Sequence, residues 1–136
     1  MSVREILLAE DNPADVYLIR EALREHRVEG ELRVAEDGQQ VLEILAGAAP
    51  ALVILDLNLP RHDGIEILQL MREREALRHV PVVVLTSSDS PRDREAASKL
   101  GVSRFLRKPS NLQEFLNLGK VFNELLGETA ANANGA

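Results

Sequence analysis

Acidic, hydroxyl and ammonium side chains stand at the ends of short apolar runs in this sequence. In chain order they are Glu10, Asp11, Asp56, Thr86 and Lys108. Runs that are short and almost wholly apolar, such as Leu52–Leu55, are typical of parallel β-strands buried on both faces. The carboxyl ends of parallel strands meet at one edge of a sheet, so we expect these side chains to share a pocket if their strands are neighbours.

Together, these groups predict a phosphoryl-transfer site that contains a metal ion. Carboxylates crowded into one pocket repel one another, unless a cation lies between them or some of them take up protons. Mg²⁺ suits such a pocket because it prefers oxygen ligands and often binds phosphate as well. The Thr86 hydroxyl and the Lys108 ammonium would hold phosphoryl oxygens. A carboxylate can be the nucleophile that forms an acyl phosphate, and catalysis is then mostly positioning and charge neutralisation.

Each of these residues also has an ordinary explanation when it is taken alone. An acid that follows a strand, such as Asp11, often only caps the next helix. Thr86 and Lys108 alone would be solvated strand ends. A shared site is the better interpretation because all the groups fall on the same predicted edge of the sheet.

The apolar runs alternate with segments of helical periodicity along the whole chain. The predicted strands are 4–9, 31–35, 51–56, 81–86 and 103–108, and the helices begin at Asn12, Gly38, Gly64, Pro91 and Asn111. This alternation predicts an α/β fold with a parallel sheet that is covered on both faces. We expect one domain over residues 1–126 and a disordered tail of small residues over 127–136.

The composition narrows the possible functions. The chain has 16 basic and 22 acidic residues and a formal net charge of -6. This argues against broad nucleic-acid binding, which relies on Lys and Arg. No cysteine is present, so disulfides and thiol chemistry are excluded. No apolar stretch approaches the ~18 residues of a membrane span and no secretory leader is recognisable, so we expect a cytoplasmic protein without membrane contacts.

The motifs around these groups resemble the receiver domain of two-component response regulators. They are Glu10-Asp11, L-D-L-N-L-P with Asp63-Gly64, V-V-V-L-T-S at 82–87, and R-K-P at 107–109. The resemblance covers about residues 4–126. It implies a flavodoxin-like doubly wound (βα)5 fold with a five-stranded parallel sheet of strand order 2-1-3-4-5. It also implies that Asp56 accepts a phosphoryl group from a phosphohistidine of a sensor histidine kinase or a phosphotransfer protein.

The resemblance also assigns the metal site. Asp11, Asp56 and the backbone carbonyl of Asn58 would bind Mg²⁺ directly, and Glu10 would act mostly through water. Glu10 replaces the commoner Asp of the family, which implies a modest change in metal affinity. Asn58 and Ser88 match two positions that modulate the lifetime of the phosphoryl group.

The phosphoryl clamp and the switch follow from the same resemblance. Thr86 and Lys108 would contact the phosphoryl oxygens, and the Lys108–Pro109 peptide bond is expected to be cis. Thr86 and Phe105 match the switch pair of the family. In that switch, the hydroxyl moves toward the phosphate and the aromatic ring turns inward, which is a population shift between two packings.

The segment E-D-N-P-A-D-V-Y-L-I-R-E-A-L and the N-L-P loop look most like small single-domain regulators that partner phytochrome-type kinases. A stand-alone receiver would act through a protein contact, a dimer or phosphate relay, and would catalyse only its own phosphorylation and dephosphorylation. A phosphorylation-independent interaction module of the same fold stays open, although such modules usually lose an acid, the hydroxyl or the lysine. An aspartyl phosphohydrolase would need a second acid where Asn58 stands, and a flavodoxin-like electron carrier would need a glycine-rich phosphate loop.

The last predicted helix carries an apolar arc that is wider than one sheet face requires. At ~100° per residue, the core-facing stripe comprises Leu112, Phe115, Leu116, Gly119, Phe122 and Leu126. A second stripe beside it comprises Leu118, Val121 and Leu125. Extra burial within the chain would explain the second stripe, but contiguous exposed apolar residues usually mark contacts. We therefore expect a homodimer or partner surface, formed with the fourth helix and the fifth strand, that includes Leu118, Val121, Phe122 and Leu125.

Overall fold

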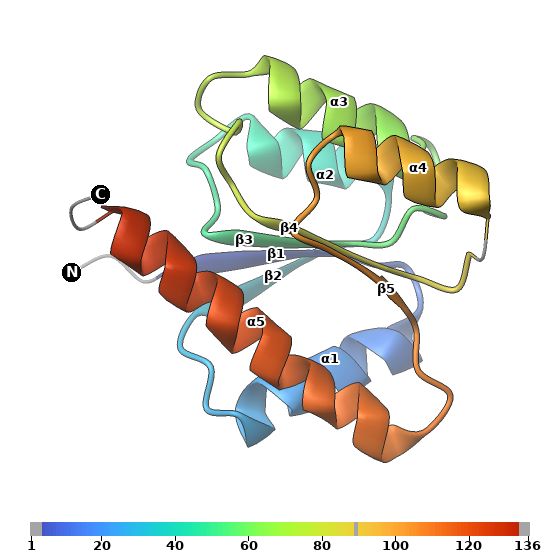
Figure 1. The fold of residues 1–136 in the computed structure, drawn as a ribbon, viewed down its shortest axis with the longest axis vertical. Coiled ribbons are helices and arrows are strands. Elements are labelled where there is room, and N and C mark those ends of the chain that lie inside the picture. The colour runs from blue at the N-terminus through green and yellow to red at the C-terminus, as the bar shows by residue number, and fades with distance from the viewer. Residues whose placement is uncertain (1–3, 89, 134–136) are drawn as a thin grey trace.

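Parallel strands form one sheet in the order β2-β1-β3-β4-β5 (Figure 1). The structure, a computed structural model, describes residues 4–88 and 90–133. The strands are β1 (Glu5–Ala9), β2 (Glu31–Ala35), β3 (Leu52–Leu55), β4 (Val82–Thr86) and β5 (Arg104–Arg107). β3 and β4 are buried at every position, as expected for central strands of a parallel sheet. The predicted α/β class, the five-stranded sheet and its strand order are confirmed.

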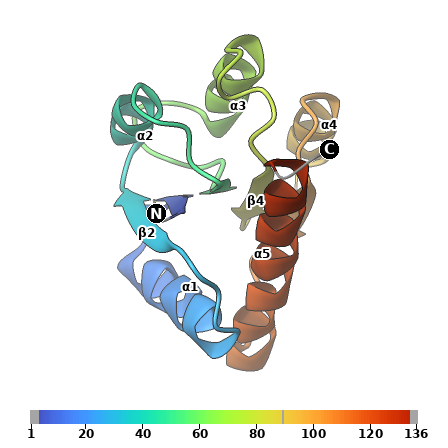
Figure 2. The same cartoon turned by 90° about the vertical axis from the view of Figure 1, so that its left-hand side faces the viewer.

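Helices cover both faces of the sheet (Figure 2). One face carries α1 (Pro13–Glu25) and α5 (Leu112–Ala133), and the other carries α2 (Gly38–Leu45), α3 (Gly64–Glu73) and α4 (Pro91–Lys99). Each face has its own apolar core. Ile19 and Phe122 belong to the core under α1 and α5, and Val41 and Leu68 belong to the core under α2, α3 and α4. The apolar faces are thus buried, and the polar strand ends lie at one edge of the sheet.

Short polar side chains fix where the helices begin. Asn12, Asp37, Asp63 and Ser90 each accept a hydrogen bond from a backbone N–H in the first turn of the helix that follows. These caps satisfy N–H groups that a helix start leaves unpaired. Because each helix follows a strand closely, the caps lie at the same edge of the sheet as the strand ends.

The prediction of an exposed apolar interface on α5 is wrong, because its residues are buried within the chain. Phe122 is 0%, Leu125 1% and Leu118 9% exposed, and Val121 is half-buried against the same core. α5 packs against α1 as well as the sheet, so two neighbours together cover an arc wider than one sheet face requires (Figure 2). Leu112, which the periodicity places in the core-facing stripe, is 60% exposed.

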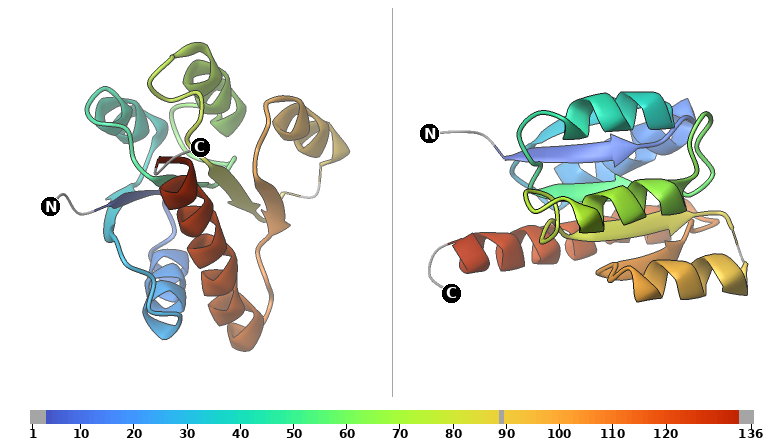
Figure 3. Two further views of the ribbon diagram at one scale, coloured as in Figure 1. Left: turned by 60° about the vertical axis from the view of Figure 1, so that its left-hand side comes forward. Right: turned by 90° about the horizontal axis from the view of Figure 1, so that it is seen from above.

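The last helix is also longer than predicted. α5 continues to Ala133, so residues 127–133 of the expected disordered tail are helical, and residues 134–136 lie outside the described part. Gly127 does not adopt the positive φ of a helix-terminating glycine. The segment that follows it is rich in alanine, the strongest helix former. The final turns of α5 project past the amino ends of the strands (Figure 3, right).

Candidate functional site

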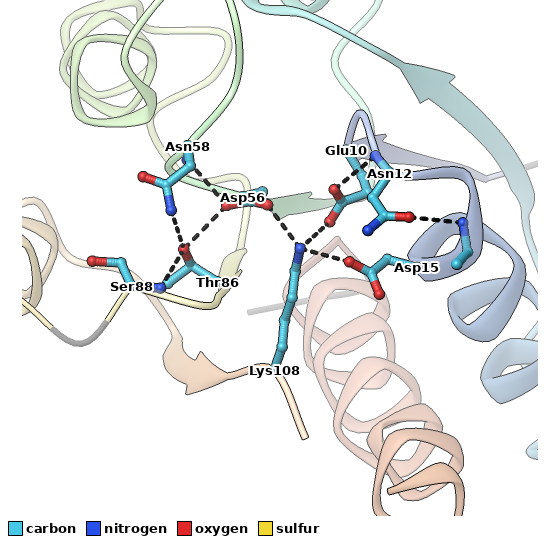
Figure 4. Close-up of polar contacts among 9 residues, drawn as sticks. Glu10, Asn12, Asp15, Asp56, Asn58, Thr86, Ser88 and Lys108 are labelled. Atoms are coloured by element: carbon cyan, nitrogen blue, oxygen red, sulfur yellow. Dashed lines mark hydrogen bonds and ion pairs between the residues drawn. The ribbon is translucent and has the colours of Figure 1, made fainter. Parts of the chain in front are cut away.

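Asp56 stands directly after β3 and is held through both carboxylate oxygens (Figure 4). Its Oδ1 accepts hydrogen bonds from the Thr86 hydroxyl at 3.0 Å and from the Asn58 backbone N–H at 3.0 Å. Its Oδ2 accepts a hydrogen bond from Lys108 Nζ at 2.9 Å. The residue is only 5% exposed. The carboxylate is therefore oriented by three donors from three different segments of the chain.

Lys108 lies just beyond β5, and its ammonium contacts three carboxylates (Figure 4). Nζ is 2.8 Å from Glu10 Oε1, 2.8 Å from Asp15 Oδ2 and 2.9 Å from Asp56 Oδ2. Burial alone would lower the pKa of Lys108, but hydrogen bonds to Asp15, Glu10 and Asp56 outweigh burial and raise this pKa above its ordinary value. The ammonium therefore stays charged and neutralises part of the acidic cluster.

Glu10, the residue after β1, is almost fully buried at 1% exposure. Its Oε2 accepts a hydrogen bond from the Asn12 backbone N–H at 3.1 Å, and its Oε1 pairs with Lys108. Burial raises the pKa of Glu10, whereas the Lys108 ammonium and the Asn12 N–H oppose the rise. The Lys108 ammonium and the Asn12 N–H are thus the groups that favour the charged form of Glu10.

The acidic cluster fits a hard divalent cation. Carboxylate oxygens of Glu10, Asp11 and Asp56 lie within 4.8 Å of one another. Mg²⁺ takes oxygen ligands of this kind and keeps several waters. Asp11 is exposed, so an ion bound beside it would remain open to water and to a phosphoryl oxygen. A cation at this point would also reduce the repulsion that Lys108 neutralises only in part.

Thr86 links the carboxylate of Asp56 to the start of α4. Its hydroxyl donates to Asp56 and accepts hydrogen bonds from the Ser88 N–H at 3.2 Å and from Asn58 Nδ2 at 3.4 Å. The Ser88 hydroxyl in turn donates to Asp93 Oδ2 in the first turn of α4 at 3.0 Å. Thr86 is fully buried. A displacement of the Thr86 hydroxyl would therefore change the hydrogen bonding of the loop that precedes α4.

Phe105 lies on β5 and is half-buried, packed against the core under α2, α3 and α4. The guanidinium carbon of Arg94, on α4, lies 4.6 Å from the centre of the Phe105 ring. This distance is within the range of a cation–π interaction. The ring therefore contacts the same helix that receives the hydrogen-bond chain from Thr86.

The structure brings the strand-end residues together at one edge of the sheet, as their positions predict. The shared group consists of Glu10, Asp11, Asp56, Thr86 and Lys108. The expectation of a cis peptide bond before Pro109 is wrong, because residues 4–88 and 90–133 contain no cis peptide bond. The trans isomer found there is the intrinsically favoured form of an X–Pro bond.

Sequence reasoning missed Asp15, Asp93 and Arg94. Asp15 contacts Lys108 directly, yet an acid in the first turn of a helix is common because it interacts favourably with the helix dipole. Asp93 and Arg94 belong to a charged segment of α4 that reads as a solvated face. Only the tertiary contacts reveal their relation to the site.

Comparison with known proteins decides the family. The model of the response regulator receiver domain matches residues 6–119. The chain belongs to the response regulator receiver family. Its relative Rcp1, a response regulator of Synechocystis sp., is 38% identical over 120 residues, which are 83% of this chain and 82% of Rcp1.

Solved structures of receivers share the fold. The phosphorylated cyanobacterial phytochrome response regulator RcpA superposes with a TM-score of 0.83 at 35% identity, covering 94% of this chain and 96% of RcpA. The receiver domain of the sensor histidine kinase PA1611 of Pseudomonas aeruginosa, with magnesium coordinated in its active-site cleft, has a TM-score of 0.75 at 28% identity, covering 93% of this chain and 99% of that domain.

Within the described residues of the present chain, no helix has the length and apolar character to cross a bilayer.

Proposed function

We propose that Asp56 accepts a phosphoryl group from a phosphohistidine of a sensor histidine kinase or a phosphotransfer protein, with the help of Mg²⁺. The observation that supports this best is the pair of donors on the Asp56 carboxylate. The Thr86 hydroxyl binds one oxygen and the Lys108 ammonium binds the other, at 3.0 and 2.9 Å. The same two groups are suited to the oxygens of a phosphoryl group attached to this carboxylate.

The transfer forms one bond and breaks one bond. A carboxylate oxygen of Asp56 attacks phosphorus, and the bond from phosphorus to the imidazole nitrogen of the phosphohistidine breaks. The bonding electrons leave with the imidazole, and the product is an aspartyl phosphate. Lys108 and Thr86 then stabilise the phosphoryl oxygens, which is the positioning and charge neutralisation that such transfers need.

A divalent cation would supply charge neutralisation on the phosphoryl oxygens. Glu10, Asp11 and Asp56 are the carboxylates that would hold it, since their oxygens converge. The backbone carbonyl of Asn58 is a further proposed ligand, and Glu10 would act mostly through water. The receiver domain of PA1611, which is 28% identical, holds magnesium in its active-site cleft and supports this assignment.

Phosphorylation would switch a protein-interaction surface on α4 and β5. In this structure the Thr86 hydroxyl donates to the Asp56 carboxylate. A phosphoryl group on Asp56 would offer this hydroxyl new acceptor oxygens. A movement of the Thr86 hydroxyl would change the loop at Ser88, which is hydrogen-bonded to Thr86 and to α4. It would also change the contact between Arg94 and Phe105, because that contact joins α4 to β5. Such a switch is a shift between two packings of one fold.

A phytochrome-type histidine kinase is the partner that we propose. RcpA, 35% identical over 94% of this chain, is a cyanobacterial phytochrome response regulator. Tests with a phytochrome-type kinase and an unrelated histidine kinase would separate the partner from the general reaction. Faster phosphorylation by the unrelated kinase would contradict the choice of partner and leave the reaction intact.

Intact-mass measurement after incubation with Mg²⁺ and acetyl phosphate tests the reaction. We expect one labile phosphoryl addition that Asp56→Asn abolishes. Asp63→Asn is the matched control, because Asp63 is an exposed helix cap and Asn caps a helix equally well. No addition from acetyl phosphate or from a histidine kinase would favour a phosphorylation-independent interaction module instead.

A further inference from the structure

We propose that Asp15 is a positioning residue that holds the Lys108 ammonium in the site while a divalent cation and a phosphoryl group occupy the other acids. The proposal rests on the function proposed above. Asp15 lies in the first turn of α1, and Lys108 lies 93 residues away, beyond β5. Their side chains approach to 2.8 Å and are only 17% and 14% exposed.

The carboxylate partners of Lys108 differ in what else they can bind. Glu10 and Asp56 belong to the group whose oxygens converge within 4.8 Å, but Asp15 does not. A divalent cation would therefore compete with Lys108 for Glu10 and Asp56 and leave Asp15 to the ammonium (Figure 4). Phosphorylation would replace the Asp56 carboxylate oxygen that faces Lys108 by phosphoryl oxygens, which the cation would bind as well.

Asp15 is placed to resolve this competition. A cation bound between Glu10 and Asp56 repels the nearby ammonium, and the repulsion is strong where solvent is largely excluded. The Asp15 carboxylate attracts the ammonium from the side of α1 and compensates the repulsion. Without Asp15, Lys108 would have only the two carboxylates that the cation also needs, so ammonium and cation would exclude each other more strongly.

Magnesium affinity tests this coupling. Isothermal titration calorimetry with Mg²⁺ would compare the full chain with Asp15→Asn, with Lys108→Met and with the double variant. Because the Asp15 charge would no longer compensate the repulsion between ammonium and cation, Asp15→Asn should weaken Mg²⁺ binding by about tenfold. In the Lys108→Met background, where no ammonium remains to compete, Asp15→Asn should have less than about a twofold effect.

Two variants separate positioning from general charge. Glu36 is exposed and lines a pocket together with Glu10 and Asp11, but it is not among the carboxylates that pair with Lys108. Glu36→Gln removes the same charge and should leave the Mg²⁺ affinity within about twofold. Asp15→Glu restores a carboxylate and should recover part of the lost affinity. Equal effects of Asp15→Asn with and without Lys108, or equal effects of Asp15→Asn and Glu36→Gln, would overturn the proposal.

Phosphorylation adds a second measurement. At saturating Mg²⁺ and acetyl phosphate, Asp15→Asn should still slow aspartyl phosphate formation by about tenfold, because the ammonium is no longer held in position. A wild-type rate in Asp15→Asn would overturn the proposal. If the unaltered protein binds Mg²⁺ but is never phosphorylated, the proposed function fails. The Mg²⁺ affinities of the single and double variants of Asp15 and Lys108 still decide the role of Asp15.

Discussion

Gly119 of α5 lies so close to α1 that we expect even one added methyl group to destabilise the fold. A Cβ atom at this position would be 2.3 Å from the Ala22 carbonyl oxygen and 2.5 Å from His26 Cδ2. The Ala22 oxygen is backbone and already accepts the His26 N–H at 3.2 Å. It cannot rotate away as a side chain can, so Gly119→Ala must push the two helices apart.

The expected magnitude combines two opposing effects. Alanine is favoured over glycine by about 1 kcal/mol inside a helix, whereas overpacking a tight contact costs about 1–3 kcal/mol or more. Since the contact is with backbone, we expect the upper part of that range and a net loss of about 1–2 kcal/mol in the free energy of unfolding.

Gly127, in the same helix, is the matched control. A Cβ there would meet nothing within 4 Å, so Gly127→Ala should raise the free energy of unfolding by about 0.5–1 kcal/mol. Urea unfolding followed by far-ultraviolet circular dichroism measures both variants. A neutral or stabilising Gly119→Ala would refute the close approach of α1 and α5. A neutral Gly127→Ala would refute the continuation of α5 beyond Leu126.

Two further predictions concern arginines. Arg72 donates to four backbone carbonyls around the start of β4 and the end of α4. Arg72→Lys cannot reproduce this planar fork and should lower the free energy of unfolding by roughly 1–3 kcal/mol, whereas Arg74→Lys, at an exposed position, should not. Arg94→Gln should raise the population of alternative Phe105 ring positions about two- to fivefold, the equivalent of one cation–π contact. Relaxation-dispersion NMR measures this, with exposed Arg92→Gln as the control; unchanged exchange in Arg94→Gln would contradict it.

Much of the fold could be predicted because its signals are local. β3 is four consecutive apolar residues, and β4 has no charged residue, so each indicates a strand buried on both faces. Asn12 before Pro13 indicates a helix start, and the side chain caps that helix as expected. Local signals of this kind reappear in the structure as element boundaries.

The role of α5 could not be predicted, because periodicity shows which residues are apolar but not how much surface their neighbours offer. Leu118 and Leu125 are apolar at helical spacing, which suits a partner surface and a wide internal core equally well. The core that buries them also contains Ile19 and Leu23 of α1. Gly119 brings α1 close enough to α5 for this, and that approach depends on residues almost a hundred positions apart.

In the site, too, the placement of the strand-end residues could be predicted from the sequence, but the contacts between their side chains could not. The edge of the sheet on which Asp56, Thr86 and Lys108 fall follows from strand direction alone. Which carboxylates Lys108 contacts depends on the reach of a flexible side chain and on the placement of α1. Asp15 enters the site only because α1 packs with its first turn beside the end of β5. An acid supplied by a helix, outside the strand ends, can hold the ammonium without serving as a metal ligand. The Mg²⁺ affinities of the single and double variants of Asp15 and Lys108 measure whether the two roles are separate in this way.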